Sequence, residues 1–170
     1  MNLSPELIAD VLQRQGLLTP AQADELRKEG QLLPQRVRNP RAYEQRAVAY
    51  ELVENLQFAQ QGPTNGTIGE EEIAQAIAAD AGLECVRIDT LGLNADLIES
   101  GMSRPFAKRH RMIPLEMVDG KLKVACANPF DIEGIDSFRR ISERELVLVV
   151  ASEPDVLRAI NEFYGLRHSV

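Results

Sequence analysis

The stretch that most limits what this chain can fold into is residues 103–131, SRPFAKRHRMIPLEMVDGKLKVACANPFD. Within it, proline and glycine separate short apolar runs from one another. Asp119-Gly120 stands between two of these runs, and this dipeptide favours the tight turn of a β-hairpin. The sequence therefore predicts two paired strands, Met112–Val118 and Lys121–Ala127. We expect a short basic helix over Ser103–Arg111, directly before the hairpin.

The rest of the second half alternates strands and helices. Leu146–Val150 is almost entirely apolar, which predicts a central strand that is covered on both faces. The other expected elements are a strand over Glu84–Ile88 and helices over Ala95–Ser100, Ile132–Ile141 and Ser152–Tyr164. This order predicts an α+β fold with a small three- to four-stranded sheet and flanking helices.

Helical patterns dominate the first half. Ser4-Pro5 places a capping residue before a proline at the first helical position, and Gly16 closes this helix. Thr19 and Gln22 have the spacing of a capping box, which predicts a second helix that ends near Lys28. The two helices together indicate a helical hairpin.

A connector is expected over Gly30–Asn39. A longer helix should begin at Asn39-Pro40 and end near Ala59, because apolar residues recur along it at roughly helical spacing. After a glycine-rich loop, a helix with an acidic first turn is expected between Gly69 and Gly82.

Length and composition bound the architecture. The chain has 170 residues, of which 44% are hydrophobic, so it can bury a core without help from a metal or a disulfide. We divide it into a helical N-terminal extension, residues 1–62, and an α+β domain, residues 63–170.

Charge and hydropathy exclude some classes of function. The formal net charge is -7 and the pI is about 4.9, which argues against general nucleic-acid binding. The first residues lack the pattern of a signal peptide, and no apolar run is long enough for a membrane span. We therefore expect no transmembrane segment and a cytoplasmic location.

The two cysteines, Cys85 and Cys126, each lie in an apolar run typical of a strand. Reduced thiols in the core are the simpler interpretation. A disulfide is the alternative, and it would require the two side chains to face each other. The chain has only two histidines, His110 and His168, besides these two cysteines. Because all four are isolated from one another in the sequence, no metal site is predicted.

A phosphate-binding loop is the first catalytic motif to look for. The glycines in residues 62–69 resemble one, but no lysine follows Gly66, and Gly120-Lys121 lies in the hairpin turn. The acids Asp131 and Asp136 have no nucleophile or metal cluster beside them, so we expect them to cap a helix and to face solvent. The chain is predicted not to be an enzyme by itself.

A basic cluster stands out in this acidic chain. It consists of Arg104, Lys108, Arg109, His110 and Arg111. At helical spacing the first, second and last of these can share one face. This face is either a solvated helix surface or a docking patch for an acidic partner or a phosphate group. A second basic group, Arg139, Arg140 and Arg144, alternates with acids and is interpreted as a solvated rim.

Several short motifs follow one another in order in the second half of the chain. They are Asp80-Ala81-Gly82-Leu83, Ser103-Arg104-Pro105-Phe106-Ala107, Met112-Ile113-Pro114-Leu115, Asn128-Pro129-Phe130-Asp131 and Leu148-Val149-Val150-Ala151-Ser152-Glu153. Their order and spacing resemble the N-terminal domain of type II secretion and type IV pilus assembly ATPases. The resemblance covers residues 64–165 well, residues 5–29 more weakly and residues 30–62 barely at all.

The resemblance implies a parent protein that is a homo-hexameric ATPase, which uses ATP and Mg at downstream ATPase domains. Its N-terminal domain would dock onto the cytoplasmic domain of an inner-membrane platform protein, and would so be peripheral to that membrane. The catalytic boxes of the family do not occur in these residues. The chain therefore resembles a docking and regulatory domain that has no cofactor of its own, with Arg104, Lys108, Arg109 and Arg111 as candidate partner-binding residues.

Some members of this family bind cyclic di-GMP through two half-motifs, each with an Arg-Leu-Gly-like triplet before a glycine corner. The corners at Gly16 and Gly66 fit, but the triplets fall on Leu7-Ile8-Ala9 and Gln57-Phe58-Ala59, without arginine or glycine. Leucine or glutamine cannot stack on a guanine as arginine does. The resemblance thus disfavours cyclic di-GMP binding, which stays as the alternative function.

Overall fold

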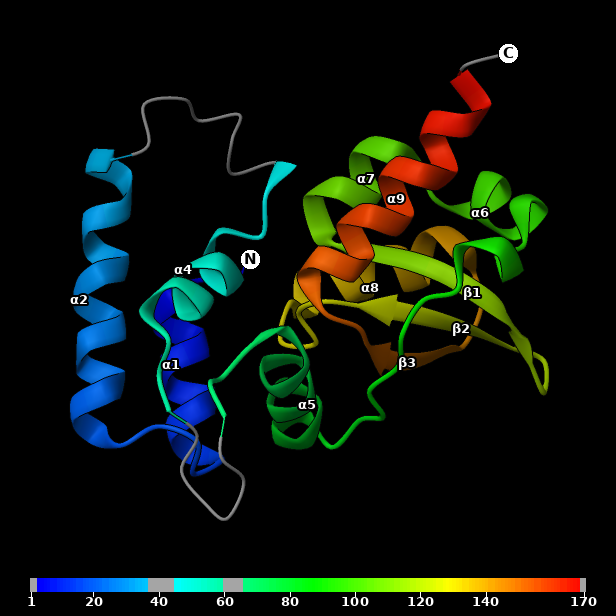
Figure 1. Cartoon of the computed structure of the whole chain (residues 1–170). Helices are drawn as coiled ribbons and strands as arrows, with labels where there is room; N and C mark the ends of the chain where they lie inside the picture. Colours follow the sequence, from blue (N-terminus) through cyan, green and yellow to red (C-terminus); the bar gives the residue numbers. More distant parts are fainter. Residues whose placement is uncertain (1–2, 37–44, 60–65, 169–170) are drawn as a thin grey trace.

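The computed structural model of the chain describes residues 3–36, 45–59 and 66–168 (Figure 1). These residues contain eight α-helices, one short 3-10 helix and a three-stranded sheet. The helices are α1 (Pro5–Arg14), α2 (Pro20–Arg36), α4 (Val48–Leu56), α5 (Glu70–Ala81), α6 (Ala95–Gly101), α7 (Arg104–His110), α8 (Ile132–Ser142) and α9 (Glu153–His168). The strands are β1 (Met112–Val118), β2 (Lys121–Cys126) and β3 (Leu146–Val150).

The sheet has the order β1-β2-β3 and is mixed. β1 and β2 are antiparallel and form the predicted hairpin, in which Asp119 and Gly120 have φ of 51° and 79°. Two positive φ angles are the requirement of the primed turn that an Asp-Gly pair favours, so this prediction is confirmed. β3 runs parallel to β2 after the chain crosses over through α8.

β3 lies at an edge of the sheet, so its predicted central position is wrong. Val149 and Val150 are buried, but Leu146–Leu148 is only partly buried. An apolar strand needs burial and does not require a strand on each side: α5 packs against β3, where Val149 and Val150 are buried.

The predicted strand over Glu84–Ile88 is reduced to one bridge, between Cys85 and Val150. Val150 N–H donates to Glu84 O at 2.8 Å, and its carbonyl accepts from Val86 N–H at 2.8 Å. The next outward donor, Ile88 N–H, binds the carboxylate of Asp155 instead of the sheet, at 2.8 Å. This hydrogen bond holds the segment against α9, so its pairing with β3 ends after the single bridge.

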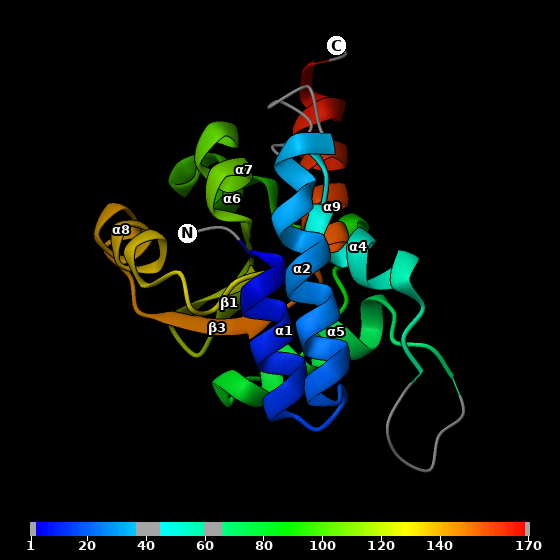
Figure 2. The same ribbon diagram turned by 90° about the vertical axis from the view of Figure 1, so that its left-hand side faces the viewer.

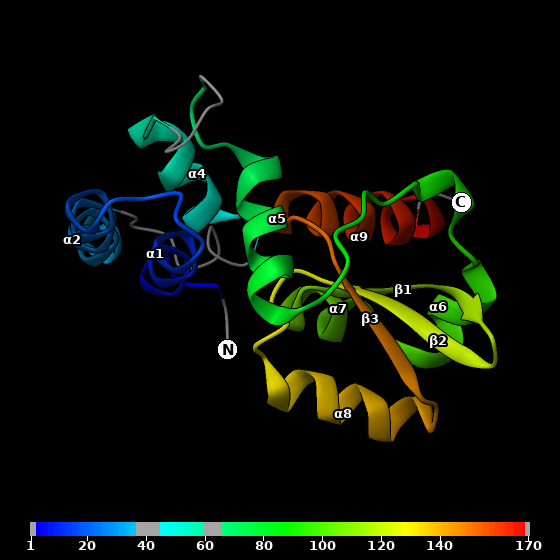
Figure 3. The ribbon, with the colours of Figure 1, turned by 90° about the horizontal axis from the view of Figure 1, so that it is seen from below.

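Helices cover both faces of the sheet, α8 on one side and α9 on the other (Figure 3). On α9, Val156, Leu157 and Ile160 are buried, as their spacing predicts. On α8, Ile135 and Phe138 are buried, whereas Ile132 and Ile141 are 68% and 60% exposed. Steps of three residues drift around a helix of 3.6 residues per turn, so only the middle of that series faces the core.

α1, α2 and α4 form a second group, which we call the helical unit; the elements from α5 to α9 form the α/β unit. α1 and α2 lie side by side as the predicted hairpin (Figure 2). Ser4 caps α1 by accepting from Leu7 N–H at 3.1 Å. Thr19 and Gln22 bond to each other's backbone N–H at 3.2 and 2.9 Å, which confirms the capping box.

The connector predicted from Gly30 is wrong, because α2 continues to Arg36. A Cβ atom at Gly30 would lie 2.6 Å from Cβ of Pro5, so this glycine permits a close approach of α2 to α1 and does not end the helix. Pro34 falls in the last turn of α2, where it removes one hydrogen bond and leaves the earlier turns intact.

The long helix predicted up to Ala59 is interrupted and shorter. Its predicted start at Asn39-Pro40 lies outside the described residues, and the described part, α4, begins only at Val48 after a break at residues 46–47. α4 ends at Leu56, because Gln57 takes a left-handed conformation with φ of 52°. The predicted boundary between residues 62 and 63 also lies outside the described residues and stays a prediction.

Candidate docking site

α7 carries the basic cluster on a helix that the sequence fixes at both ends. Ser103 Oγ accepts from Phe106 N–H at 3.3 Å, with a proline in the first turn, and Arg111 ends the helix with φ of 52°. Ala107 is fully buried against the α/β core. Phe106 packs on Phe138 of α8, with ring centroids 6.0 Å apart. The opposite face of α7 is therefore held toward solvent.

Three cations of the cluster lie on this short helix, and we call them the cationic ridge: Arg104, Lys108 and Arg109. Arg109 is exposed, and Arg104 and Lys108 are partly exposed. In the part of the chain that the structure describes, none of the three forms an ion pair, and Nε of Arg104 is buried without a hydrogen-bond partner. The ridge thus presents positive charge that the protein itself does not neutralise.

Arg111 does not lie on the ridge. Its side chain is 6% exposed, and its guanidinium donates to the carbonyl of Lys108 and lies 3.7 Å from Oε1 of Glu153. Burial raises the pKa of Glu153 to about 7, although the charge of Arg111 acts against this shift. The left-handed residue after α7 turns this arginine inward, so it cannot share the face of Arg104 and Lys108.

His110 is also directed inward, so this member of the basic cluster does not lie on the cationic ridge. Its Nδ1 lies 2.9 Å from Oδ2 of Asp131, with exposed fractions of 13% and 3%, and its ring packs on Phe106. Asp131 caps α8 by accepting from Gly134 N–H at 3.1 Å, which confirms its predicted capping role. The prediction that it faces solvent is wrong, because the side chain is buried beneath His110 and the start of α8. Burial acts to raise the pKa of Asp131, but its interactions, among them the hydrogen bonds from His110 and Gly134, lower the pKa overall.

Arg139 pairs with Asp136 at 2.6 Å on the exposed face of α8, as expected for a solvated rim. Cys85 and Cys126 are both free thiols, and burial raises the pKa of Cys126 to about 12. Across the residues that the structure describes, no cluster of ligands could hold a metal ion, and no helix meets the length and hydropathy needed to cross a membrane.

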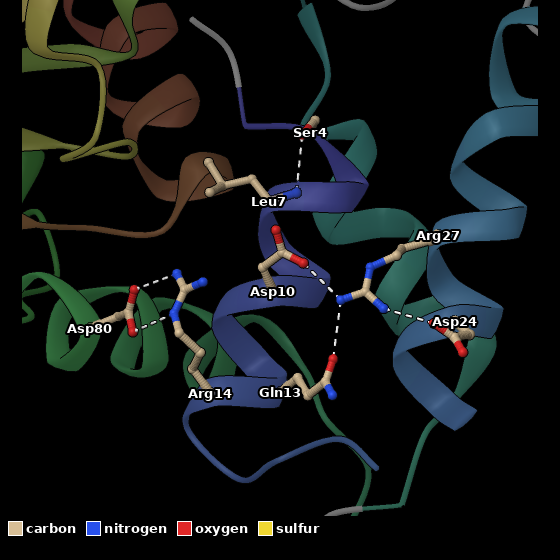
Figure 4. A network of polar contacts seen from close by, with 8 residues as sticks. All are labelled: Ser4, Leu7, Asp10, Gln13, Arg14, Asp24, Arg27 and Asp80. Atoms are coloured by element: carbon tan, nitrogen blue, oxygen red, sulfur yellow. Dashed lines mark hydrogen bonds and ion pairs between the residues drawn. The ribbon is translucent and has the colours of Figure 1, made fainter. Parts of the chain in front are cut away.

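A polar network that the sequence did not single out ties the helical unit to α5 (Figure 4). Nε and Nη2 of Arg14 donate to the two carboxylate oxygens of Asp80, at 3.2 and 2.8 Å. The hydrogen bond from Arg14 lowers the pKa of Asp80. Arg27 of α2 bridges Asp10 of α1 at 2.7 Å and Asp24 at 2.9 Å. Opposite charge is the only signal in the sequence for these ion pairs, because most of the paired residues are far apart in the chain.

The two triplet positions of the cyclic di-GMP half-motifs lie within packed structure. Ile8 and Ala9 are fully buried in α1, and Phe58 is 5% exposed. Gly16 has φ of 76°, so the chain turns there after α1. Arg14, two residues before this glycine, and Arg27 of α2 are both engaged by carboxylates.

The sequence model of the MshEN domain matches residues 81–170, which is more than half of the chain. The chain belongs to the MshEN domain family.

Solved structures share the fold of this MshEN domain. A structure of MshE with cdg superposes with a TM-score of 0.60 and 16% identity, over 92% of this chain and 98% of that chain. The N-terminal domain of XpsE superposes with a TM-score of 0.55 and 22% identity, over 95% of this chain and 96% of that chain. The predicted α+β class with a helical extension is therefore confirmed.

A pilus ATPase is also similar in sequence. The type IV pilus assembly ATPase PilB of Myxococcus xanthus (strain DK1622) is 23% identical over 100 residues, which are 59% of this chain and 18% of that protein. The chain thus spans less than a fifth of the length of this relative. Together with the family match, it confirms the relation to the N-terminal domains of secretion and pilus assembly ATPases.

Proposed function

We propose that this MshEN domain is a non-catalytic docking domain of a type II secretion or type IV pilus assembly ATPase. Its cationic ridge would contact an acidic surface on the cytoplasmic domain of an inner-membrane platform protein. The parent would be a cytoplasmic hexamer that hydrolyses ATP with Mg in domains downstream of this one. The family and the pilus ATPase relative support the parent, but they do not identify the partner.

The observation that carries the docking proposal is the unneutralised charge of the ridge. The chain has a net charge of -7, yet Arg104, Lys108 and Arg109 have no carboxylate within ion-pair distance in the described residues. Some other exposed cations of the domain do have one, such as Arg139 with Asp136 and Lys121 with Glu145, whereas Arg140 and Arg144 have none among the described residues. A rigid row of unpaired cations speeds association with an acidic surface and fixes its orientation.

Binding of the platform protein's cytoplasmic domain to this domain tests the proposal, by biolayer interferometry at two salt concentrations. Lys108→Glu with Arg109→Glu reverses the exposed part of the ridge and leaves the partly buried Arg104 in place. Arg140→Glu with Arg144→Glu, on and just after α8, is the matched control with the same change in charge. We expect the ridge variant to lose about tenfold in affinity at low salt, since steering by rim charges is strongest there.

Equal affinity of the ridge variant and the control variant would remove the ridge from the interface. Loss of binding in both variants would point to the net charge of the domain instead of to this surface. A P-loop in the sequence downstream of residue 170 would support the proposed parent ATPase independently of the partner.

Sensing of cyclic di-GMP is the second candidate, because MshE, which shares the fold, was solved with cdg. The burial of Ile8 and Ala9 and the engagement of Arg14 by Asp80 count against it. Titration calorimetry with cyclic di-GMP decides the question. Absence of heat at high micromolar ligand would end this candidate, and saturable heat that Arg14→Ala alters would favour it.

A further inference from the structure

The contact between the helical unit and the α/β unit contains a buried ion pair. Glu153, the first residue of α9, and Arg111, the residue after α7, are 7% and 6% exposed. Their nearest charged atoms, Oε1 and Nε, are 3.7 Å apart, which is longer than a hydrogen bond. The beginning of α9 points toward the helical unit (Figure 3). The two side chains line a cavity of about 400 Å³, whose other walls come from α1, α2 and α4.

α4 and the residues before it contribute the other charged and titratable groups that face Glu153. Tyr50 is 1% exposed, and burial, followed by the charge of Glu153, raises its pKa. The charge of Glu51 acts to raise the pKa of Glu153. Arg46 lines the same cavity but is held by Glu51 at 2.6 Å.

The other elements around this carboxylate add little charge. The start of α1 and the two residues before it line the cavity with Leu3, Ser4 and Pro5, and α2 lines it with Gly30 and Leu33, none of which titrates. On the side of α5, Glu70 accepts a hydrogen bond from Ser152 at 2.5 Å. Arg111 is therefore the nearest charge that favours the ionised form of Glu153, together with the positive end of the α9 dipole.

We propose that docking of the helical unit onto the α/β unit is coupled to protonation of Glu153, so that docking takes up a proton and rising pH loosens it. A carboxylate in water ionises freely, but one covered by α4 loses its hydration and gains only a single cation at 3.7 Å. The neutral acid is the form that this junction accommodates best. The two units would thus be joined by a contact that responds to pH.

The direction in which docking depends on pH follows from the pKa of Glu153, which burial raises from 4.5 to about 7 in the docked chain. Between these values the docked state binds more protons than the undocked state. The contribution of Glu153 to docking is therefore most favourable at low pH, weakens as pH rises through this window, and is constant above about pH 7.

Hydrogen exchange measured by mass spectrometry on the full chain tests the coupling, at about pH 5.5 and about pH 8 with correction for intrinsic exchange. In the wild type, we expect exchange in α4 to rise at least about tenfold more than exchange in β2, because the window from pH 5.5 to the folded pKa of about 7 spans more than one pH unit and each unit corresponds to about a factor of ten. Glu153→Gln mimics the protonated acid, so α4 should stay protected at both pH values. Glu145→Gln, at a side chain that is 78% exposed, is the control and should behave as the wild type.

Two results would overturn the proposal. One is the same pH response of α4 in Glu153→Gln as in the wild type, which would assign it to other groups. The other is a parallel rise in α4 and β2, which would mean global unfolding and not undocking. If Glu153→Gln does not fold, the pKa of Glu153 can be measured in the wild type by carboxyl-carbon NMR. A pKa near the ordinary value of 4.5 would contradict the coupling. A pKa near 7, with a matching change at the α4 amides, would support it.

Discussion

Gly134 of α8 is the position where a single added methyl group should disturb the most polar contacts. A Cβ atom there would lie 2.5 Å from Oδ2 of Asp131 and would also overlap the ring of His110. Both contacts are closer than real Cβ atoms allow, and both partners are held, His110 by Phe106 and Asp131 by its cap on α8. Gly134→Ala must therefore displace the pair that joins α7 to the start of α8.

The expected cost can be built from the contacts that are lost. Loss of the Asp131 cap costs about 1 kcal/mol, and loss of a buried hydrogen bond to a charged group costs about 2 kcal/mol. Alanine regains about 1 kcal/mol over glycine inside a helix. The variant should thus be about 2 kcal/mol less stable than the wild type, which is large against the marginal stability of a domain.

Urea denaturation followed by circular dichroism measures this difference. Gly165→Ala in α9 is the matched control, because no atom lies within 4 Å of the added methyl group and the variant should gain up to about 1 kcal/mol. In a His110→Ala background the cost of Gly134→Ala should shrink, since one of the two clashing partners is gone. A Gly134→Ala variant as stable as the wild type would refute the reasoning, and so would an undiminished cost without His110.

Three further predictions use the same denaturation assay. Gly30→Ala should destabilise the chain by about 1–3 kcal/mol, because its methyl group would lie 2.6 Å from Cβ of Pro5; an unchanged midpoint would contradict the close approach of α1 and α2. Tyr164→Phe removes a buried 2.7 Å hydrogen bond to the carbonyl of Met102 and should cost about 1–2 kcal/mol, so a neutral result would show that this carbonyl finds another donor. The pKa of Asp131 is lowered, so its contribution is present above the ordinary Asp pKa and is lost as pH falls through the lower folded value. Asp131→Asn should therefore flatten the acid limb of stability against pH, and an unchanged limb would assign that limb to other carboxylates.

Local chemistry made much of the fold predictable. Asp119-Gly120 admits few turns other than the one observed, and Ser4, Thr19 and Gln22 specify their helix starts through bonds within four residues. The fold class follows from the order of these elements. The errors arose where a residue type is explained by packing between elements and not by the local chain. Gly30, for example, allows α2 to approach α1 closely and does not end a helix.

The candidate site was predictable only in part. The cationic residues of α7 could be recognised from their spacing, but the inward turn of Arg111 depends on Glu153, which follows it only after a hairpin, a helix and another strand. The Arg14–Asp80 pair has the same character. Pairing between distant charges is set by packing, and a single sequence carries no period or motif that reports it.

The position of β3 at the edge of the sheet bears on how this domain behaves when it is concentrated. The opposite edge, β1, contains Pro114 and an irregular register beside it, features that discourage strand addition. β3 has neither, and within the described residues Glu84 and Val86 satisfy only the outward groups of Val150. The backbone of Leu146–Leu148 is thus the most receptive template for a strand of another molecule, so aggregation of the isolated domain should begin there, and lysine at Leu148 should suppress it.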